Sequence, residues 1–322
     1  MKIVVLERNS VGTDIDVTCY EDFGEVIYFG NTVEADAEQH IGDADIVIAN
    51  KAPMNESTLK NCPNVKLICE FATGFDNIDL EYCRSRNIKV TNVVDYSTAA
   101  VAQHTFALAL YVLEKLSFYD HYVKSGAYEN QDRFSNFDEA YTELEGKTWG
   151  IIGMGNIGRR VAKIAEAFGC KVIFYSASGN SVCRDYERVD FDRLCRESDF
   201  LSIHCPLSEK TRNLIDLNAF KNMKETAILI NVARGPIVND KDLYTALTEH
   251  MIAGAGLDVL GKEPIAKDNP LGRIQDSKKL IITPHMAWAS TESRERVVNE
   301  VYKNIQAFLA GKDRNVINEK EK

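Results

Sequence analysis

A glycine-rich turn between an apolar run and a helical pattern constrains this sequence more than any other feature. Residues 147–158 read Lys-Thr-Trp-Gly-Ile-Ile-Gly-Met-Gly-Asn-Ile-Gly, so that Gly153, Gly155 and Gly158 have the spacing Gly-x-Gly-x-x-Gly. The apolar run before Gly153 predicts a short buried strand, and apolar residues then recur at helical spacing as far as Phe168. A strand, a glycine turn and a helix in this order are the fingerprint of a dinucleotide-binding site.

Each glycine of the fingerprint has a physical role. Gly153 allows the chain to turn tightly, Gly155 leaves room for a pyrophosphate, and Gly158 lets the helix pack close to the strand. The N-terminus of the helix then faces the phosphates, so we include Asn156 and Ile157 among the predicted cofactor-binding residues. A purely structural turn gives the same letters, but the strand before it and the helix after it favour the dinucleotide site.

Charge and cysteine content limit the partners and the compartment that we expect. The formal net charge is −10 and the pI is about 5.2, which argues against nucleic acid or an anionic membrane as a partner. Eight cysteines are scattered without a Cys-x-x-Cys pair, which fits a reducing compartment and argues against a disulfide framework and a metal site. The N-terminus reads as a strand rather than a signal sequence, and no apolar run approaches membrane-spanning length, so we expect a cytoplasmic protein.

Short apolar runs alternate with helical patterns along the chain, which predicts an α/β fold with two doubly wound parallel sheets. In the first part of the chain, the predicted strands are 3–6, 26–29, 46–49, 67–71 and 89–93. After the fingerprint, they are 172–175, 200–204, 227–232, 252–257 and 280–282. The helical pattern at 291–309 returns the chain to the first part. We therefore predict a Rossmann-type dinucleotide-binding domain, 99–291, inserted into a flavodoxin-like substrate domain, 1–98 with 292–322, with a cleft between them.

The connection between the predicted domains contains two distinct segments. Residues 97–124 contain a long helical pattern whose apolar face runs from Val101 to Leu116. The following segment, 125–145, is polar and aromatic. It is either a loop over a site or a surface arm that contacts a second subunit.

Two strand ends are candidate ligand-binding edges, because ligands of such sheets meet the loops at the carboxyl ends of the strands. Ala72-Thr73-Gly74 follows the fourth strand, where a binding edge and a plain turn are both compatible with the sequence. At the end of the second strand of the fingerprint domain, an acidic residue usually holds the adenosine ribose and repels a 2′-phosphate. Ser176 occupies that position here.

The serine leaves the choice between NAD and NADP open. Without the acid, a 2′-phosphate is not repelled, and Ser176, Ser178 and backbone N–H groups are available to bind it. No arginine follows immediately, as a phosphate site would prefer, although Arg184 is close enough in sequence to fold back.

Three polar residues lie just past predicted strand ends of the second domain: Arg234, Glu263 and His285. Each has a structural interpretation when taken alone: a surface ion pair, a turn acid and a strand-end histidine. We interpret two other histidines, His104 on a helix and His204 at a strand end, as structural. The case for the three residues therefore rests on their joint occurrence in recognisable motifs.

Those motifs resemble the D-isomer-specific 2-hydroxyacid dehydrogenase family. They are Asn231–Pro236, Asp258–Pro264 and Thr283–Ser290, together with the glycine fingerprint, and the resemblance also includes Ala72–Gly74 and Val101–His104. It therefore covers essentially the whole chain. Pro-His-Met-Ala-Trp-Ala-Ser at 284–290 and Gln103-His104 are most similar to the glycerate dehydrogenase, or hydroxypyruvate reductase, branch.

The reaction that the resemblance implies needs these three side-chain types. Hydride passes between NAD(P)H and the carbonyl carbon of a small 2-oxo acid, and the carbonyl oxygen takes up a proton. A histidine titrates near neutrality, so His285 can supply that proton and take it back in the reverse direction. Glu263 beside it would orient the ring and favour its protonated form. Arg234 offers a planar fork for the substrate carboxylate and would also polarise the carbonyl.

The resemblance implies further contacts and a preferred substrate. Thr73 and Gly74 would offer backbone N–H groups to the substrate carboxylate. The cofactor would be lined by Val101, Cys205, Pro206, Thr211, Ala233 and Asp258. Hydroxypyruvate and glyoxylate are the favoured substrates, giving D-glycerate and glycolate, and a homodimer is expected through the region from Val101 to Leu116.

Two rival functions come from relatives of the same family. Some transcriptional corepressors, the C-terminal binding proteins, sense dinucleotides and keep the catalytic residues. Phosphite dehydrogenase acts on another small anion. Formate is disfavoured, because Glu263 stands where the formate dehydrogenase relatives carry glutamine.

Overall fold

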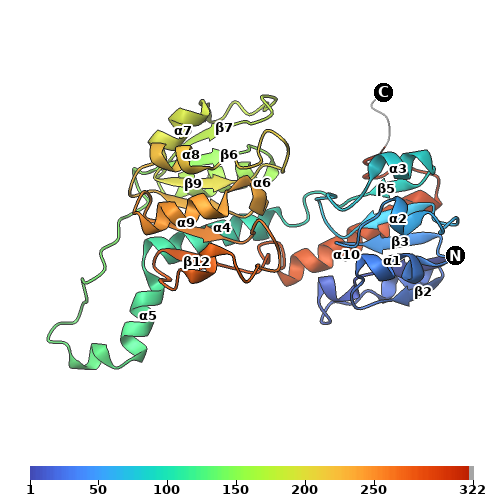
Figure 1. The fold of residues 1–322 in the computed structure, drawn as a ribbon, viewed down its shortest axis with the longest axis horizontal. Coiled ribbons are helices and arrows are strands. Elements are labelled where there is room, and N and C mark those ends of the chain that lie inside the picture. The colour runs from blue at the N-terminus through green and yellow to red at the C-terminus, as the bar shows by residue number, and fades with distance from the viewer. Residues whose placement is uncertain (319–322) are drawn as a thin grey trace. The chain divides into compact units, whose positions relative to one another are not determined.

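The structure, a computed structural model, describes residues 1–318 and contains two compact units. Unit 1 consists of Met1–Ser97 together with the chain from Ala289 onwards, and unit 2 is Thr98–Trp288. Each unit has its own parallel sheet with helices on its faces (Figure 1). The charged tail 319–322, which we assigned to the first domain, lies outside the described residues.

Unit 1 is built on a five-stranded sheet in the order β2-β1-β3-β4-β5, with every pair parallel. This is the flavodoxin-like order predicted from the alternating pattern. The central strands β3 and β4 are buried along their whole length, as expected for apolar runs covered on both faces. The strands are β1 (Lys2–Val5), β2 (Glu25–Tyr28), β3 (Ile46–Ala49), β4 (Leu67–Glu70) and β5 (Lys89–Thr91). The helices are α1 (Glu34–Ile41), α2 (Glu56–Leu59), α3 (Leu80–Ser85) and α10 (Thr291–Leu309), with 3-10 turns η1 (Arg8–Val11) and η2 (Thr18–Phe23).

Unit 2 is built on a seven-stranded parallel sheet in the order β12-β11-β10-β9-β6-β7-β8. The order reverses at β6, which is the Rossmann topology, and ligands bind where such a reversal occurs. The strands are β6 (Thr148–Ile152), β7 (Lys171–Tyr175), β8 (Glu187–Arg188), β9 (Phe200–Ile203), β10 (Ile228–Asn231), β11 (Gly254–Leu257) and β12 (Leu280–Ile282). The α-helices are α4 (Thr98–Leu113), α5 (Leu116–Lys124), α6 (Asn156–Ala167), α7 (Phe191–Glu197), α8 (Leu217–Asn222) and α9 (Asp240–Thr248). The 3-10 turns are η3 (Ala127–Asn130), η4 (Gly235–Ile237) and η5 (Pro270–Arg273).

Helix α4 packs unusually close to strand β11. A Cβ added to Gly254 would lie 2.6 Å from the side chain of Val112, and one added to Gly256 would lie 2.7 Å from that of Leu108. Glycine at both positions lets the apolar face of α4 cover the sheet directly. Val101 lies on the same helix and is buried.

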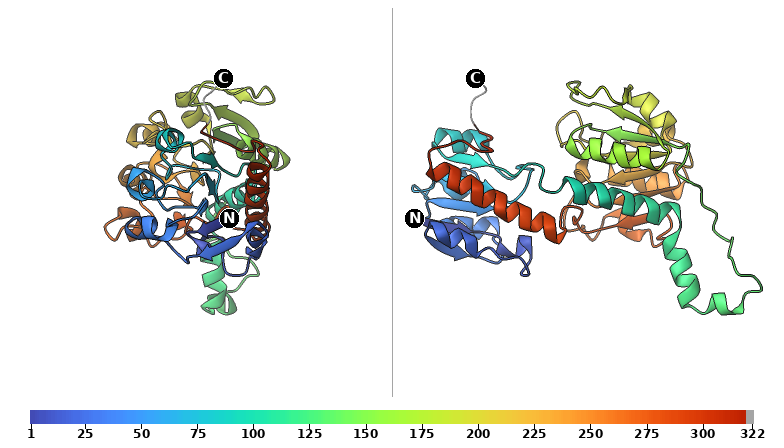
Figure 2. Two further views of the ribbon diagram at one scale, coloured as in Figure 1. Left: turned by 90° about the vertical axis from the view of Figure 1, so that its right-hand side faces the viewer. Right: turned by 180° about the vertical axis from the view of Figure 1, so that it is seen from behind.

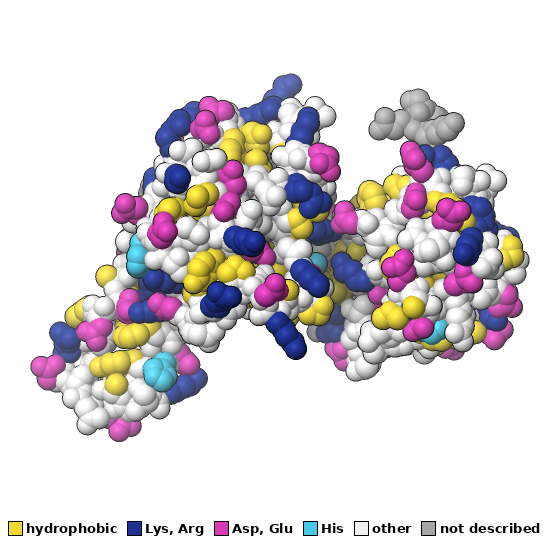
Figure 3. All heavy atoms as spheres, in the orientation of Figure 1, with side chains coloured by type: hydrophobic (Ala, Val, Ile, Leu, Met, Phe, Trp, Pro, Cys, Tyr) yellow, Lys and Arg dark blue, Asp and Glu magenta, His cyan; other side chains and the backbone are white. Residues whose placement is uncertain are grey.

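The long helix expected from residues 97–124 is broken. Lys115 has a positive φ of 55°, so α4 ends at Leu113 and α5 begins at Leu116 with a new direction. No residue of α5 is buried in the described chain. Figures 1 and 2 show α5 and the segment after it extending away from the sheet of unit 2, and Figure 3 shows hydrophobic side chains gathered on this extension.

The strands predicted from apolar runs are all present, with ends shifted by at most two residues. Strand β8 was not predicted, because Glu187 and Arg188 are polar, exposed and too few to show alternation. Among residues 1–318, no helix is long and apolar enough to cross a membrane. The same part of the chain holds no group of three or more His, Cys, Asp or Glu side chains placed to bind a metal ion.

Candidate active site

The glycine turn at the end of β6 has the geometry of an anion-binding site. Gly153 has a positive φ of 95°, and a Cβ there would lie 2.8 Å from the backbone of His204 and Cys205. A Cβ on Gly158 would lie 2.1 Å from the carbonyl oxygen of Gly153, so this glycine allows α6 to approach the strand. Both positions therefore require glycine for packing.

Gly155 differs from these two glycines, because a Cβ added to it meets nothing within 4 Å. Its backbone lies open at the start of α6, where it is the N-cap residue and no side chain caps the helix. The first N–H groups of α6 can therefore bind an external anion, and the helix dipole favours negative charge there. These residues fit the pyrophosphate of a dinucleotide.

The loop after β9 contributes to the same edge of the sheet. Thr211 is buried, and its hydroxyl donates to the carbonyl oxygen of Pro206 at 2.9 Å and accepts from the N–H of Ser208 at 2.8 Å. The loop that carries Cys205 and Pro206 is thus closed by an internal side chain. Burial raises the pKa of the Cys205 thiol to about 11, so the thiol stays protonated and contributes shape rather than charge.

His285 and Glu263 form a close pair in unit 2. Nδ1 of His285 lies 2.6 Å from Oε2 of Glu263, and the other carboxylate oxygen of Glu263 accepts from the N–H of Leu260 at 3.0 Å. Because a carboxylate only accepts hydrogen bonds, Nδ1 carries a proton and donates a hydrogen bond to Glu263. The ring orientation is thereby fixed, and Nε2 is left for another partner.

The backbone around His285 is held by Asp258, which lies at the end of β11. His285 has a positive φ of 53°, and its N–H donates to the carbonyl oxygen of Asp258 at 2.8 Å. The buried carboxylate of Asp258 accepts from the N–H groups of Met286 and Ala287, both at 2.8 Å, and from the hydroxyl of Thr283 at 2.6 Å. This network keeps the histidine in a conformation that a non-glycine residue rarely adopts.

His104, which we interpreted as structural, has polar partners in this network. Its Nε2 lies 2.9 Å from Oγ1 of Thr283 and 3.5 Å from the carboxylate of Asp258. No signal in the sequence connects a residue of α4 with the loop that follows β12. The pairing becomes visible only when the sheet brings the two segments together.

Arg234 follows β10 in a loop that lies against the loop of Glu263. A Cβ on Gly235 would lie 1.9 Å from the carbonyl group of Leu260, so glycine lets the two backbones touch. Nη1 of Arg234 donates to the carbonyl oxygen of Ala233 at 2.8 Å, and the amide of Asn231 donates to the carbonyl oxygen of Arg234 at 3.0 Å. Continuous contacts therefore link the loops of Arg234, Glu263 and His285 at the carboxyl ends of β10, β11 and β12.

Thr73 and Gly74 belong to unit 1, where they follow β4. The hydroxyl of Thr73 donates to the carbonyl oxygen of Val93 at 2.6 Å, and its own carbonyl oxygen accepts from the side-chain amide of Asn92 at 2.8 Å. These bonds fix the loop against the segment after β5. Its backbone N–H groups remain candidates for binding a carboxylate.

Comparisons with known proteins identify the family of this chain. Residues 106–287 match the family model "D-isomer specific 2-hydroxyacid dehydrogenase, NAD binding domain". A hydroxypyruvate reductase of Blautia hydrogenotrophica is 38% identical over 324 residues, covering 99% of this chain and 100% of that protein. A glycerate dehydrogenase of Methylorubrum extorquens is 34% identical over 317 residues, covering 98% of each.

A solved structure shows the same fold over nearly the whole length. An acyclic imino acid reductase in complex with NADPH and D-Arg is 31% identical, with a TM-score of 0.87, and the match covers 98% of this chain and 100% of that one. The glycine turn, the strand order and the matched NAD-binding domain support one conclusion. The chain belongs to the D-isomer specific 2-hydroxyacid dehydrogenase family and is an NAD(P)-dependent oxidoreductase.

Proposed function

We propose that this enzyme reduces a small 2-oxo acid to the D-2-hydroxy acid, with hydroxypyruvate and glyoxylate as the favoured substrates and D-glycerate and glycolate as the products. The observation that carries the proposal is the 2.6 Å contact between His285 and Glu263 at the edge of a dinucleotide-binding sheet. The hydroxypyruvate reductase and glycerate dehydrogenase relatives, which match over almost the whole chain, support this choice of substrates.

In this reaction the reduced nicotinamide, when bound, supplies a hydride to the carbonyl carbon of the substrate. Nε2 of the protonated His285 gives its proton to the carbonyl oxygen, so that a hydroxyl group forms and a neutral ring remains. Glu263 keeps its hydrogen bond to Nδ1 throughout and stabilises the protonated ring before the transfer. Proton transfer of this kind typically contributes about 10²–10⁴ in rate.

Arg234 would bind the substrate carboxylate and polarise the carbonyl group. The guanidinium presents donors in a planar fork that matches a carboxylate, and one donor already anchors the side chain to Ala233. By family resemblance, the N–H groups of Thr73 and Gly74 would bind the same carboxylate. The remaining rate enhancement then comes from holding substrate and nicotinamide in line.

We also propose a homodimer, because the extension of unit 2 carries exposed apolar side chains, and a cytoplasmic location, because the eight scattered cysteines fit a reducing compartment. Leu116 and Val123 on α5 are exposed, as are Phe134, Phe137 and Tyr141 in the segment after it, and Phe134 is 89% exposed. A second copy of the chain would remove these apolar side chains from water. Light scattering on the purified chain tests the proposal: twice the chain mass supports it, and a monomer at micromolar concentration contradicts it.

A turnover assay tests the proposed activity. NADH and NADPH are each combined with hydroxypyruvate, glyoxylate, pyruvate and larger 2-oxo acids, and phosphite with the oxidised cofactors serves as a further arm. We expect the highest kcat/KM with hydroxypyruvate or glyoxylate. A dinucleotide-sensing protein would bind the cofactor with little turnover of any substrate. Turnover of phosphite alone would indicate a phosphite dehydrogenase.

A further inference from the structure

The end of β7 lacks the group that normally selects NAD over NADP. An acid at this position bonds the ribose hydroxyls of the adenosine and repels a 2′-phosphate. Here Ser176 follows β7 directly and is buried. It begins a turn that is closed by a hydrogen bond from the N–H of Gly179 to its carbonyl oxygen at 3.1 Å.

An arginine lies against this turn, although none follows it closely in the sequence. Strand β8 pairs in parallel with β7, with Arg188 beside Phe174, so the arginine starts within the sheet and reaches toward its carboxyl edge. Nη1 of Arg188 donates to the carbonyl oxygen of Gly179 at 2.9 Å. The guanidinium is thereby anchored next to Ser176–Gly179, the turn where the adenosine ribose binds in this fold.

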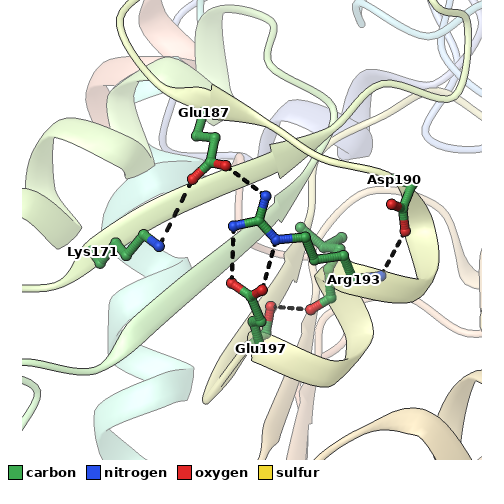
Figure 4. A network of polar contacts seen from close by, with 7 residues as sticks. Lys171, Glu187, Asp190, Arg193 and Glu197 are labelled. Carbon is green, nitrogen blue, oxygen red and sulfur yellow. Dashed lines mark hydrogen bonds and ion pairs between the residues drawn. The ribbon is translucent and has the colours of Figure 1, made fainter.

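Neighbouring acidic groups do not neutralise this arginine. Side chains alternate between the faces of a strand, so Glu187 points away from the side of Arg188. Glu187 pairs instead with Arg193 at 2.6 Å and with Lys171 at 3.8 Å, in the network of Figure 4. Within residues 1–318, Arg188 forms no ion pair with a carboxylate. Its positive charge is therefore available to a ligand.

The remaining donors suit a phosphate group. A guanidinium has five N–H donors, and the bond to Gly179 uses one of them. The hydroxyl of Ser178 accepts from the N–H of Asn180 at 3.2 Å, so its own proton is free to donate. A phosphate monoester offers oxygen acceptors that a planar guanidinium binds in a fork.

We propose that Arg188, with Ser176 and Ser178, forms a subsite for the 2′-phosphate of NADPH, so that this enzyme prefers NADPH to NADH. The inference deepens the proposed function and rests on it, because it names the residue that selects the cofactor at the same site. Arg184, the arginine considered from the sequence, lies in the loop before β8 and makes no polar contact with the turn in the described chain. It therefore provides a matched control.

Calorimetry with two cofactor fragments tests the subsite without requiring turnover. Adenosine 2′,5′-bisphosphate carries the 2′-phosphate, and 5′-AMP lacks it. For the wild-type enzyme we expect the bisphosphate to bind about ten- to a hundred-fold more tightly than 5′-AMP, the range typical of charge-assisted hydrogen bonds. Arg188→Gln should abolish this difference and leave the Kd of 5′-AMP unchanged, whereas Arg184→Gln should leave both values unchanged.

Two conservative variants separate charge from structure. Glutamine retains an N–H donor for Gly179, so a purely structural role for Arg188 predicts that Arg188→Gln keeps the discrimination. Arg188→Lys retains the positive charge and should keep part of the discrimination between the two fragments. In steady-state assays, Arg188→Gln should raise the KM for NADPH and leave the KM for NADH and the kcat with NADH as in the wild type.

The outcomes distinguish this inference from the proposed function. Equal affinity of the wild type for the two fragments overturns the subsite, and so does preserved discrimination in Arg188→Gln. After either of these results, turnover of 2-oxo acids with NADH would still support the proposed function. Failure of the wild type to bind either fragment would contradict the dinucleotide site itself, and the subsite would fall with it.

Discussion

The first strands of the two parallel sheets end in different ways, although both sheets are doubly wound. In unit 2, β6 runs into Gly153 and Gly155, and the N–H groups at the start of α6 have no side-chain cap. In unit 1, β1 is followed by Glu7, which is only 7% exposed. One oxygen of Glu7 accepts from the N–H groups of Asn50, Lys51 and Ala52 at 2.7, 2.8 and 3.1 Å.

At the carboxyl edge of each sheet, backbone N–H groups are placed to bind a negatively charged group. The two units differ in where that group comes from. Unit 1 supplies its own carboxylate, which satisfies the donors after β3 and would repel a phosphate placed there. Unit 2 leaves its donors open, so a bound ligand must supply the negative charge. The doubly wound fold therefore does not decide which unit binds the dinucleotide. The segment after the first strand, which carries Glu7 in unit 1 and the glycine turn in unit 2, makes this difference.

The largest effect that tests this comparison concerns the chemistry of unit 2. Replacing His285 with alanine removes the proton donor but leaves the glycine turn intact. We expect kcat to fall by about 10²–10⁴ while the Kd of the dinucleotide stays within a few-fold of the wild type. His250→Asn, at an exposed histidine after α9 whose positive φ of 59° asparagine tolerates, is the control and should retain full turnover. Equal loss of turnover and binding in His285→Ala would mean that the histidine is structural.

A smaller effect separates two glycines of the same turn. In Gly155→Ala the new methyl group meets no protein atom, so any loss of stability is limited to the poorer N-cap that alanine makes, but the group enters the space for the pyrophosphate. The Kd of the dinucleotide should rise about tenfold or more, as expected for overpacking. In Gly158→Ala the methyl group lies 2.1 Å from the carbonyl oxygen of Gly153. This clash should lower the free energy of unfolding of unit 2 by about 1–3 kcal/mol.

Denaturant unfolding and fluorescence titration of both glycine variants measure these quantities. If Gly155→Ala binds the dinucleotide as tightly as the wild type, the pyrophosphate does not lie over the turn. If Gly158→Ala is as stable as the wild type, close packing of α6 on β6 is not needed. Either result would weaken the contrast between the two sheet edges.

Two buried titratable groups give the two units opposite dependences of stability on pH. Burial raises the pKa of Glu70, at the end of β4, well above its usual value, and burial lowers the pKa of His204, after β9, to about 3. Oε1 of Glu70 and Nδ1 of His204 have no hydrogen-bond partner among the described residues. Unit 1 thus buries an acid and unit 2 buries a base, each favouring its neutral form.

The signs follow from the folded and unfolded pKa values. A raised carboxyl pKa gives unit 1 stability that is complete below the unfolded value, about 4.3, and is lost as pH rises. A lowered histidine pKa gives unit 2 stability that is complete above about 6.5 and is lost toward pH 3, at about 1.4 kcal/mol per pH unit. Glu70→Gln should therefore stabilise unit 1 increasingly as pH rises above about 4.3. His204→Gln should remove the acid-side loss in unit 2.

Hydrogen exchange of β4 and β9 amides across this pH range reports the two units separately. The relevant quantity is the change of each variant's stability with pH, not its absolute value, because substitution of a buried side chain also alters packing. Parallel pH profiles for Glu70→Gln and the wild type would mean that Glu70 is ionised in the folded chain. For His204, parallel profiles would mean that the buried ring accepts a proton.

The sequence predicts the regular parts of this molecule and misses features made by pairing over distance. Buried strands such as β10 can be predicted from apolar runs, and the glycine turn from its spacing, because each depends on residues that are close together in the sequence. Strand β8 exists only because Glu187 and Arg188 lie beside β7, and its two polar residues show no periodicity. The break at Lys115 is equally invisible, since the helical pattern of apolar residues continues past it.

The candidate site divides in the same way. Arg234, Glu263 and His285 stand out because each follows a strand within a recognisable motif. The hydrogen bond of His104 to Thr283 joins residues 179 positions apart, and local pattern carries no information about such a contact. The anchoring of Arg188 on Gly179 depends on strand pairing, so the sequence pointed only to the nearer Arg184.

Hydrogen exchange with and without the dinucleotide tests the contrast between the two sheet edges most directly. Addition of NADPH or NADH should slow exchange of the amides at 153–158, where the donors of unit 2 meet the phosphates. The amides of 50–52 should exchange slowly without cofactor, because Glu7 already holds them, and should become fast in Glu7→Ala. Cofactor-dependent protection at 50–52 with none at 153–158 would contradict the account.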